Sequence, residues 1–169
     1  MMAIGLNSGE VLLMSAEYDT AAWPEAGARD VSPRQSNPLG RLPLFTMSES
    51  VSGLAISQQG DEIQVVAVGA NGQIELATGT RQSRLTAMLN PASAPEYEWN
   101  VARSEAHVSG ASRVFIDGDH RHVFALDSDD RLRAFSIRGL HEGGAESFSS
   151  DAIANQHGKV VDAEMLVGG

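Results

Sequence analysis

The stretch Ala111–Arg138, ASRVFIDGDHRHVFALDSDDRLRAFSIR, decides the fold. It contains three short runs of β-branched and aromatic residues, a composition that suits a pleated, packed surface. The runs are Val114–Ile116, His122–Leu126 and Leu132–Ile137, separated by polar turns at Asp117–Asp119 and Asp127–Asp130. These turns interrupt any apolar spacing of three and four residues, so the stretch predicts a meander of antiparallel strands and not a helix.

The same layout recurs earlier in the chain. Val51–Ile56 and Ile63–Val68 are runs on either side of a turn at Gln58–Asp61, and Asn71–Gly72 then leads into Ile74–Ala77. Asn-Gly between two such runs predicts a hairpin with a type I′ turn, which needs positive φ at both central residues. The ends of the chain carry only part of the pattern. Ala3–Leu6 and Val11–Met14 flank Asn7–Gly9, and Val160–Leu166 matches a first strand alone.

Gly9, Gly72 and Asp130 align as equivalent turn positions, roughly sixty residues apart, which is longer than the roughly 40–45 residues of a compact WD40 blade. Such a repeat is typical of a β-propeller, in which each blade is a small antiparallel sheet stacked on its neighbours. The apolar runs Val65–Val68 and Val123–Leu126 suit inner strands covered on both faces. A β-sandwich or an irregular meander of the same strands is the alternative.

We therefore predict one all-β domain, partial and propeller-like, made of tandem antiparallel blades with long loops. Its expected parts are a partial blade over 1–20, a loop over 21–50, blades over 51–110 and 111–158, and the start of a next blade over 159–169. An incomplete set of blades of this kind is expected to come from a larger protein and to associate with itself through uncovered edges.

Several shorter segments have their own expectations. Leu42–Met47 predicts a short edge strand, and Tyr97–Val101 predicts an outer strand with packed aromatic side chains. Arg81–Leu89 is either a strand or a short helix. Ser147–Ser149 suggests a strand, and a helix over Ser150–Gln156 is an open alternative.

Composition restricts the function. Twelve basic against twenty-two acidic residues give a formal charge of −10, so nucleic acid and anionic lipid are poor partners. The chain has no Cys, which excludes disulfides and thiol chemistry. It also lacks an apolar stretch of about eighteen residues that would predict a membrane helix.

Candidate sites for chemistry are weak. His120 and His122, beside Asp117 and Asp119, would face one side of a strand and suggest a metal pair. A zinc site needs three or four ligands, however, and an exposed polar turn is the simpler interpretation. Asp127–Asp130 resembles the beginning of a calcium loop but lacks the later Gly and Glu of an EF-hand.

No residue is therefore nominated as catalytic, cofactor-binding or metal-binding, and the chain is predicted not to be an enzyme. No nucleophile motif such as GxSxG, no HExxH and no paired carboxylates stand out. The aromatic residues are expected to anchor the strands in the core and not to form a ligand-binding cage. The arginines are spread over different strands and turns, so direct phosphate binding is not expected. They are Arg81, Arg84, Arg113, Arg121, Arg131, Arg133 and Arg138.

Four fragments carry a family resemblance. IGLNSGEVLLMSAEYDT (4–20), GLAISQQGDEIQVVAVGANGQIELAT (53–78), SRVFIDGDHRHVFALDSDDRLRAFSIRG (112–139) and KVVDAEMLVGG (159–169) together resemble the extracytoplasmic insert of the long form of the phosphate ABC transporter permease subunit. In that family the insert is rich in propeller-like repeats, and it follows the first membrane helix. The resemblance brings no functional residues with it.

The resemblance implies a non-catalytic accessory or interaction domain on the periplasmic face of the inner membrane, with no cofactor. Its expected partners are other subunits of a phosphate ABC transporter and its periplasmic phosphate-binding protein. The parent would be anchored in the membrane, and this segment would lie outside it. The alternative is a WD40-like β-propeller interaction module unrelated to transport, although the chain lacks the Gly-His and Trp-Asp signatures of WD40 blades.

Overall fold

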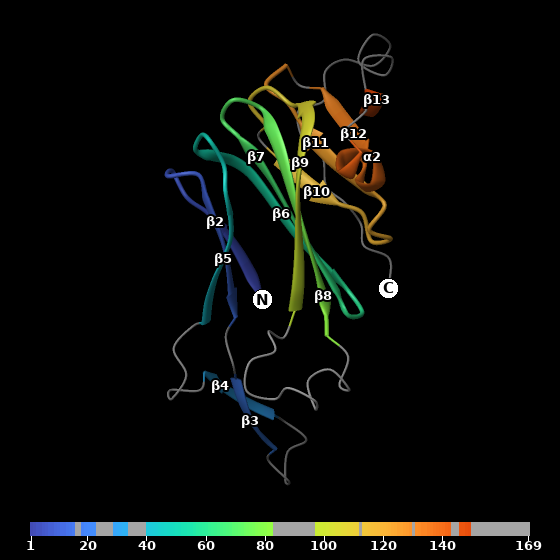
Figure 1. The fold of residues 1–169 in the computed structure, drawn as a ribbon. Coiled ribbons are helices and arrows are strands. Elements are labelled where there is room, and N and C mark those ends of the chain that lie inside the picture. The colour runs from blue at the N-terminus through green and yellow to red at the C-terminus, as the bar shows by residue number, and fades with distance from the viewer. Residues whose placement is uncertain are drawn as a thin grey trace.

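The chain folds into a series of antiparallel β-sheets (Figure 1). The computed structural model describes residues 1–15, 18–22, 29–33, 40–82, 97–111, 113–129, 131–142 and 146–149. Predictions for Asp130, for most of 81–89, for the helix over 150–156 and for the strand over 160–166 lie outside these residues. In the described part none of the helices is long and apolar enough to cross a membrane.

The first sheet has the strand order β1-β2-β5, with β1 at Met2–Gly5, β2 at Glu10–Ser15 and β5 at Gly40–Thr46. Between β2 and β5 the chain forms a separate two-stranded sheet, β3 (Tyr18–Ala22) with β4 (Arg29–Pro33). The predicted loop over 21–50 was therefore wrong at β4, whereas β5 confirms the edge strand predicted over Leu42–Met47. Its prolines suggested a loop, but Pro33 ends β4 and Pro43 lies in β5, an edge strand where no partner requires the missing N–H.

The second sheet is a four-stranded meander in which consecutive strands are neighbours. Its strands are β6 (Val51–Gln59), β7 (Glu62–Gly69), β8 (Gln73–Arg81) and β9 (Tyr97–His107). All of β7 after its first residue is buried, as expected for an inner strand covered on both faces. The outer strand β9 carries Tyr97 and Trp99 with ring centroids 6.0 Å apart, which confirms the expected packing of its aromatic residues.

The third sheet repeats this meander with β10 (Arg113–Ile116), β11 (His122–Leu126), β12 (Leu132–Ser136) and β13 (Glu146–Ser149). The short helix α2 (Ile137–His141) follows β12 and was not predicted. It begins because the Ser136 hydroxyl accepts a hydrogen bond from the Gly139 amide at 2.9 Å, a typical N-cap. The second and third sheets occupy 51–107 and 113–149, within the ranges predicted for the two blades.

Repeated backbone hydrogen bonds relate the first two sheets. The Gly9 carbonyl accepts from Met47 N at 3.0 Å, and the Gly72 carbonyl accepts from Val108 N at 2.8 Å. Met47 and Val108 each follow the last strand of their sheet, and the two glycines have nearly the same φ, +85° and +86°. The equivalence of these two turns, expected from the sequence, is therefore a real structural repeat.

A second repeated bond joins each sheet to the next. Ala70 N donates to the Ser50 carbonyl at 2.8 Å, and Ser128 N donates to the Ser109 carbonyl at 3.0 Å. In each case a turn of one sheet bonds to the linker that leads in from the preceding sheet. Strand β6 contacts β1 of the first sheet and β10 of the third, so the sheets stack in chain order.

The turn at Asn71–Gly72 differs from its prediction. Only Gly72 has a positive φ there, so the turn is not of type I′, which needs positive φ at both positions. The Asn71 side chain instead accepts a hydrogen bond from Gln73 N at 3.1 Å, which stabilises the turn locally.

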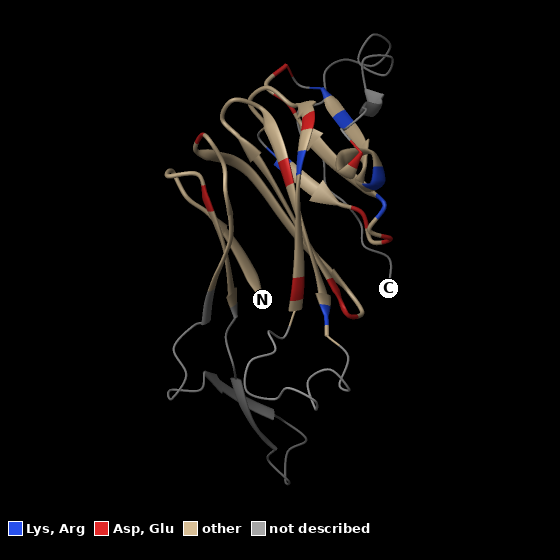
Figure 2. Ribbon diagram, viewed as in Figure 1, with Lys and Arg blue, Asp and Glu red and all other residues tan. Residues whose placement is uncertain are grey.

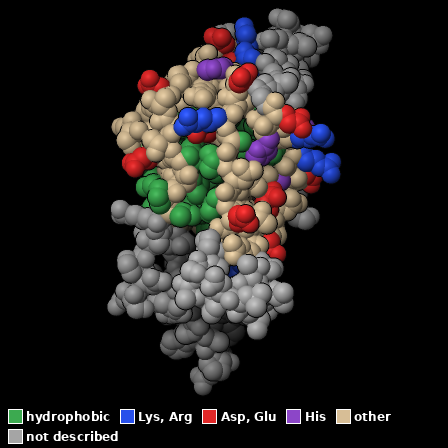
Figure 3. Space-filling model, in the orientation of Figure 1, with side chains coloured by type: hydrophobic (Ala, Val, Ile, Leu, Met, Phe, Trp, Pro, Cys, Tyr) green, Lys and Arg blue, Asp and Glu red, His purple; other side chains and the backbone are tan. Residues whose placement is uncertain are grey.

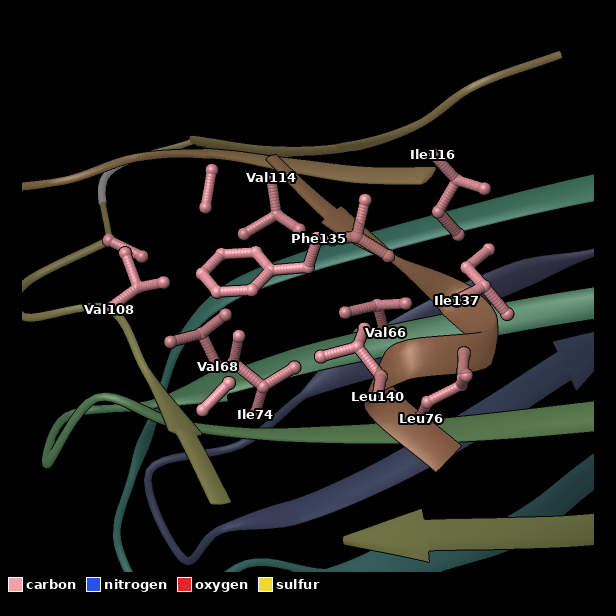
Figure 4. Packing of buried hydrophobic residues seen from close by; sticks show 14 residues of the cluster. Val66, Val68, Ile74, Leu76, Val108, Val114, Ile116, Phe135, Ile137 and Leu140 are labelled. Atoms are coloured by element: carbon pink, nitrogen blue, oxygen red, sulfur yellow. The ribbon is translucent and has the colours of Figure 1, made fainter. Parts of the chain in front are cut away.

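Two hydrophobic clusters hold the stack together. One fills the space between the first and second sheets and includes Val11, Ile63 and Val65. The other lies between the second and third sheets, where Phe135 sits between Val114 and Val68 (Figure 4). Burying a side chain of this size contributes roughly 1.5–3 kcal/mol. Figure 3 shows a further hydrophobic area on the front face, near β5 and β9.

The all-β prediction with tandem antiparallel sheets is thus confirmed, and the sheets stack as successive propeller blades would. Within the described residues they do not close into a ring. Acidic residues lie largely at turns and strand ends, as Figure 2 shows.

Candidate functional site: a polar cleft between the second and third sheets

One face of the second sheet is apolar along one part of its strands and polar along the next. Val66 and Leu76 are paired across β7 and β8 and belong to the core against the third sheet. Two residues further along the same face, Gln64 on β7 and Thr78 on β8 are paired instead. The polar row extends to both outer strands, through Ser57 on β6 and Asn100 on β9. The third sheet packs on the apolar half of this face, and the polar half lies beside the edge of the third sheet.

A cleft with a volume of ≈ 580 Å³ lies over this polar half. The second sheet supplies Glu62, Gln64 and Thr78. One opposite wall is residues 120–122, at the end of the β10–β11 turn and the start of β11, and the other is formed in and around α2 by Ser136, Ile137, Arg138, His141 and Glu142. The two walls are joined because Ile137 N donates to the Arg121 carbonyl at 2.8 Å. Ile137 and Leu140 anchor α2 in the core, which fixes its polar residues beside the cleft.

His120 connects the two sheets at this cleft. Its Nε2 lies 2.8 Å from Ser57 Oγ, and its Nδ1 lies 3.2 Å from Glu62 Oε1. The ring is buried, and Glu62 Oε1 also accepts from Gln64 Nε2 at 2.8 Å. With Glu62 ionised, Nδ1 must be the donor, since a carboxylate only accepts. His120 has φ +55°, the only positive value among the described residues other than glycine.

The order Ser57–His120–Glu62 has the connectivity of a hydrolytic triad. This grouping cannot be recognised in the sequence, because Ser57 and Glu62 lie on neighbouring strands of the second sheet and His120 lies in a turn of the third sheet. Ser57 does not line the cleft, whereas His120 and Glu62 do. The hydrogen bonds therefore fix His120 and the turn that carries it, and they do not present the serine hydroxyl to a ligand.

The two histidines considered as a metal pair do not act together. His120 is in a turn and not on a strand, so the expected common face does not exist. His122 Nδ1 lies 3.0 Å from Asp117 Oδ2, while both nitrogens of His120 are engaged elsewhere. Across the residues that the structure describes, no three His, Asp or Glu side chains are placed to hold a metal ion.

Asp117 and Asp127 are turn residues. Asp117 Oδ1 accepts from Arg121 N at 2.7 Å and from His122 N at 3.0 Å. Burial of Asp117 opposes its ionisation, but these bonds and His122 outweigh that effect and hold the pKa of Asp117 below its usual value. Asp117 therefore stabilises its turn, but the expectation of a fully exposed polar turn was wrong for His120, whose side chain is buried against the second sheet.

Asp127 repeats the arrangement. Its Oδ1 accepts from Asp129 N and from Arg131 N, both at 2.9 Å, and its Oδ2 accepts from Arg133 Nε at 2.8 Å. Burial again opposes ionisation, and the bond from Arg133 with those from the backbone overcomes it, so the pKa of Asp127 is lowered. The side chain is 3% exposed.

A second ionisable group is buried on the opposite face of the second sheet. Glu75 is 1% exposed, and Arg103 Nε lies 2.9 Å from its Oε1 in an ion pair that lacks the alignment of a hydrogen bond. Arg103 also donates through Nη2 to the Thr46 carbonyl at 3.2 Å, which links the first and second sheets. Burial raises the pKa of Glu75, and the charge of Arg103 offsets part of that rise.

The arginines are less scattered than expected, since Arg121 and Arg138 both line the cleft. Neither was identifiable from sequence as a site residue, because the turn and α2 meet only in the folded chain. No known family model matches the sequence, and no characterised protein matches it significantly.

Proposed function

We propose that this chain is a non-catalytic binding domain, accessory to an inner-membrane phosphate ABC transporter permease and exposed on its periplasmic face. The observation that carries the binding role is the polar cleft at the edge of the second sheet. Its floor is a rigid paired ladder, and its walls are a turn and a helix fixed by hydrogen bonds and core contacts. Sites built this way bind partners without large rearrangement.

The same geometry disfavours catalysis by Ser57. A serine nucleophile must be open to the substrate while its base holds it. Ser57 is bonded to His120 but lies outside the cleft that a substrate would enter. The contact of His120 Nδ1 with Glu62 would suit a triad, but a triad cannot act without a hydroxyl that the substrate can reach. The group serves to connect two sheets.

The transporter setting rests on the resemblance of four fragments in chain order to the permease insert. Tandem sheets joined by repeated hydrogen bonds suit a spacer that holds a binding surface outside the membrane. The formal charge of −10 also suits contact with proteins and disfavours contact with nucleic acid or anionic lipid.

The test is photo-crosslinking in cells that make the full parent protein. A photoreactive amino acid replaces Arg138, which is exposed at the cleft, and in a matched variant it replaces Gln58, which is exposed on β6. We expect crosslinks to transporter subunits or to the phosphate-binding protein from position 138 and few from position 58. Crosslinks from position 138 only to unrelated proteins would contradict the transporter setting.

A further inference from the structure

Two oxygen atoms on the floor of the cleft have no hydrogen-bond partner. Gln64 Oε1 and Thr78 Oγ1 are both fully buried, and neither has a partner. Gln64 is 3% exposed, and its Nε2 donates to Glu62, which fixes Oε1 as the end without a partner. The two residues lie directly opposite each other on β7 and β8. A buried polar atom left without a partner is destabilising, so a ligand that supplies donors here gains affinity by doing so.

Glu62 adds a third acceptor to the same floor. Its carboxylate lines the cleft and is 41% exposed. A carbonyl oxygen, a hydroxyl oxygen and a carboxylate therefore lie together on neighbouring positions of β7 and β8. A primary ammonium group has three N–H donors and no acceptor, which matches this set, whereas a hydroxyl group brings only one donor.

The rim of the cleft carries two arginines beside one carboxylate, that of Glu142. Arg121 in the β10–β11 turn and Arg138 in α2 both line it. Arg138 contacts Glu142 through Nε at 2.9 Å, which uses one of the five N–H donors of its guanidinium group. Guanidinium groups bind carboxylates with matched geometry. The floor thus suits a cationic donor and the rim suits a carboxylate.

We propose that this cleft binds a small zwitterion of the amino-acid class. The ammonium group bonds to Gln64 Oε1, Thr78 Oγ1 and Glu62, and the carboxylate is directed to Arg121 and Arg138. The volume of ≈ 580 Å³ falls within the roughly 300–1,000 Å³ of small-molecule sites. This inference rests on the binding role proposed above and gives that role a small-molecule ligand.

The experiment is thermal denaturation of the whole chain with a mixture of the standard amino acids, followed by each one separately. Glycine betaine is the matched control, because its quaternary nitrogen has no N–H. We expect at least one amino acid to raise the Tm and betaine to leave it unchanged. Gln64→Leu removes the unpaired acceptor and should weaken binding about tenfold, whereas Gln58→Leu, an exposed change on β6, should not.

The free proteins supply a second readout. Thr78→Val should unfold at or above the temperature of the original chain, because it deletes a buried hydroxyl oxygen that has no partner. An equal response to betaine, no response to any amino acid, or full binding by Gln64→Leu would overturn the inference. Crosslinking to transporter subunits without amino-acid binding would overturn this inference alone. Amino-acid binding without such crosslinks would support it and contradict the transporter setting.

Discussion

His120 Nε2 lies 2.8 Å from Ser57 Oγ, and this contact joins the β10–β11 turn to the first strand of the preceding sheet. It is the side-chain counterpart of the backbone bonds that connect successive sheets. Because the His120 ring is buried, the hydrogen bond is shielded from water and its loss leaves a buried nitrogen without a partner.

Removing the hydroxyl of Ser57 tests this connection. Ser57→Ala should lower the free energy of unfolding by about 1–3 kcal/mol, the cost of leaving a buried hydrogen-bonding atom without a partner. Ser8→Ala is the control, since the Ser8 hydroxyl bonds to Glu10 at an exposed position. Urea denaturation measures both variants. Equal stability of the two variants would show that the contact between His120 and Ser57 does not hold the sheets together.

Gly72 tests the repeated turn. A Cβ at this position would lie 3.1 Å from the Val108 carbonyl, and the backbone has φ +86°. Gly60 also has a positive φ, +56°, but a Cβ there would meet no atom within 4 Å. Gly60→Ala should therefore cost only the roughly 1–2 kcal/mol of a left-handed conformation. Gly72→Ala should cost more, because it also crowds the carbonyl beside the Val108–Gly72 bond.

The comparison requires urea denaturation of both variants under one condition. If Gly72→Ala does not lower the free energy of unfolding by more than Gly60→Ala does, the backbone at Val108 can move away from the new Cβ without a large loss of stability. In that case the equivalence of Gly9 and Gly72 would reflect turn conformation alone.

Asp127 predicts a loss of stability in acid. Its pKa is lowered in the folded chain, so its contribution is present above the ordinary Asp pKa of about 3.9 and disappears as the pH falls through the lower, folded value. Asp127→Asn should cost about 1.5–3 kcal/mol at neutral pH, the range for a hydrogen bond to a charged group. The difference between variant and original should shrink as Asp127 becomes protonated.

Asp129→Asn is the matched control two residues further along the turn, at an exposed position. It should change the free energy of unfolding by less than about 0.5 kcal/mol. A pH-independent difference for Asp127→Asn would indicate that its role is steric and not electrostatic.

Glu75 predicts the opposite pH dependence. Burial raises the pKa of Glu75, so the folded chain holds this proton more tightly than the unfolded chain does. The contribution is fully present below the ordinary Glu pKa of about 4.3 and is lost as the pH rises through the raised value. Glu75→Gln, which cannot ionise, should remove this loss.

The measurement is the difference in unfolding free energy between the original chain and Glu75→Gln, taken by urea denaturation from acid to neutral pH. The difference should move in favour of the variant as the pH rises. A difference that stays constant over this range would show that Arg103 fully compensates the buried carboxylate.

Much of the fold follows from local sequence. The apolar run Val65–Val68 has a length and composition that suit a strand covered on both faces, and β7 is such a strand. Asp117 and Asp127 satisfy nearby backbone amides within a few residues, so their turns are readable from the chain itself. The repeat of Gly9 and Gly72 was visible for the same reason, because each turn is formed by consecutive residues.

Other features were invisible to local patterns. The edge strand predicted over Leu42–Met47 is β5, but its start at Gly40 and its pairing with β2 were not predicted, because Pro43 is a poor strand former that only an edge position tolerates. Helix α2 is short and depends on its Ser136 cap and on the burial of Leu140. In both cases a tertiary contact outweighs a weak local preference.

The sequence alone thus determined that the chain is acidic, lacks cysteine and forms antiparallel strands in tandem repeats, because apolar runs and turn residues act between near neighbours. Only tertiary structure decided that His120 reaches Ser57 and Glu62, that Arg121 and Arg138 share one cleft, and that Gln64 Oε1 is buried without a partner. These relations depend on how one sheet stacks on another. That stacking is set by the burial of side chains that lie far apart in the sequence, so no local sequence pattern can predict it.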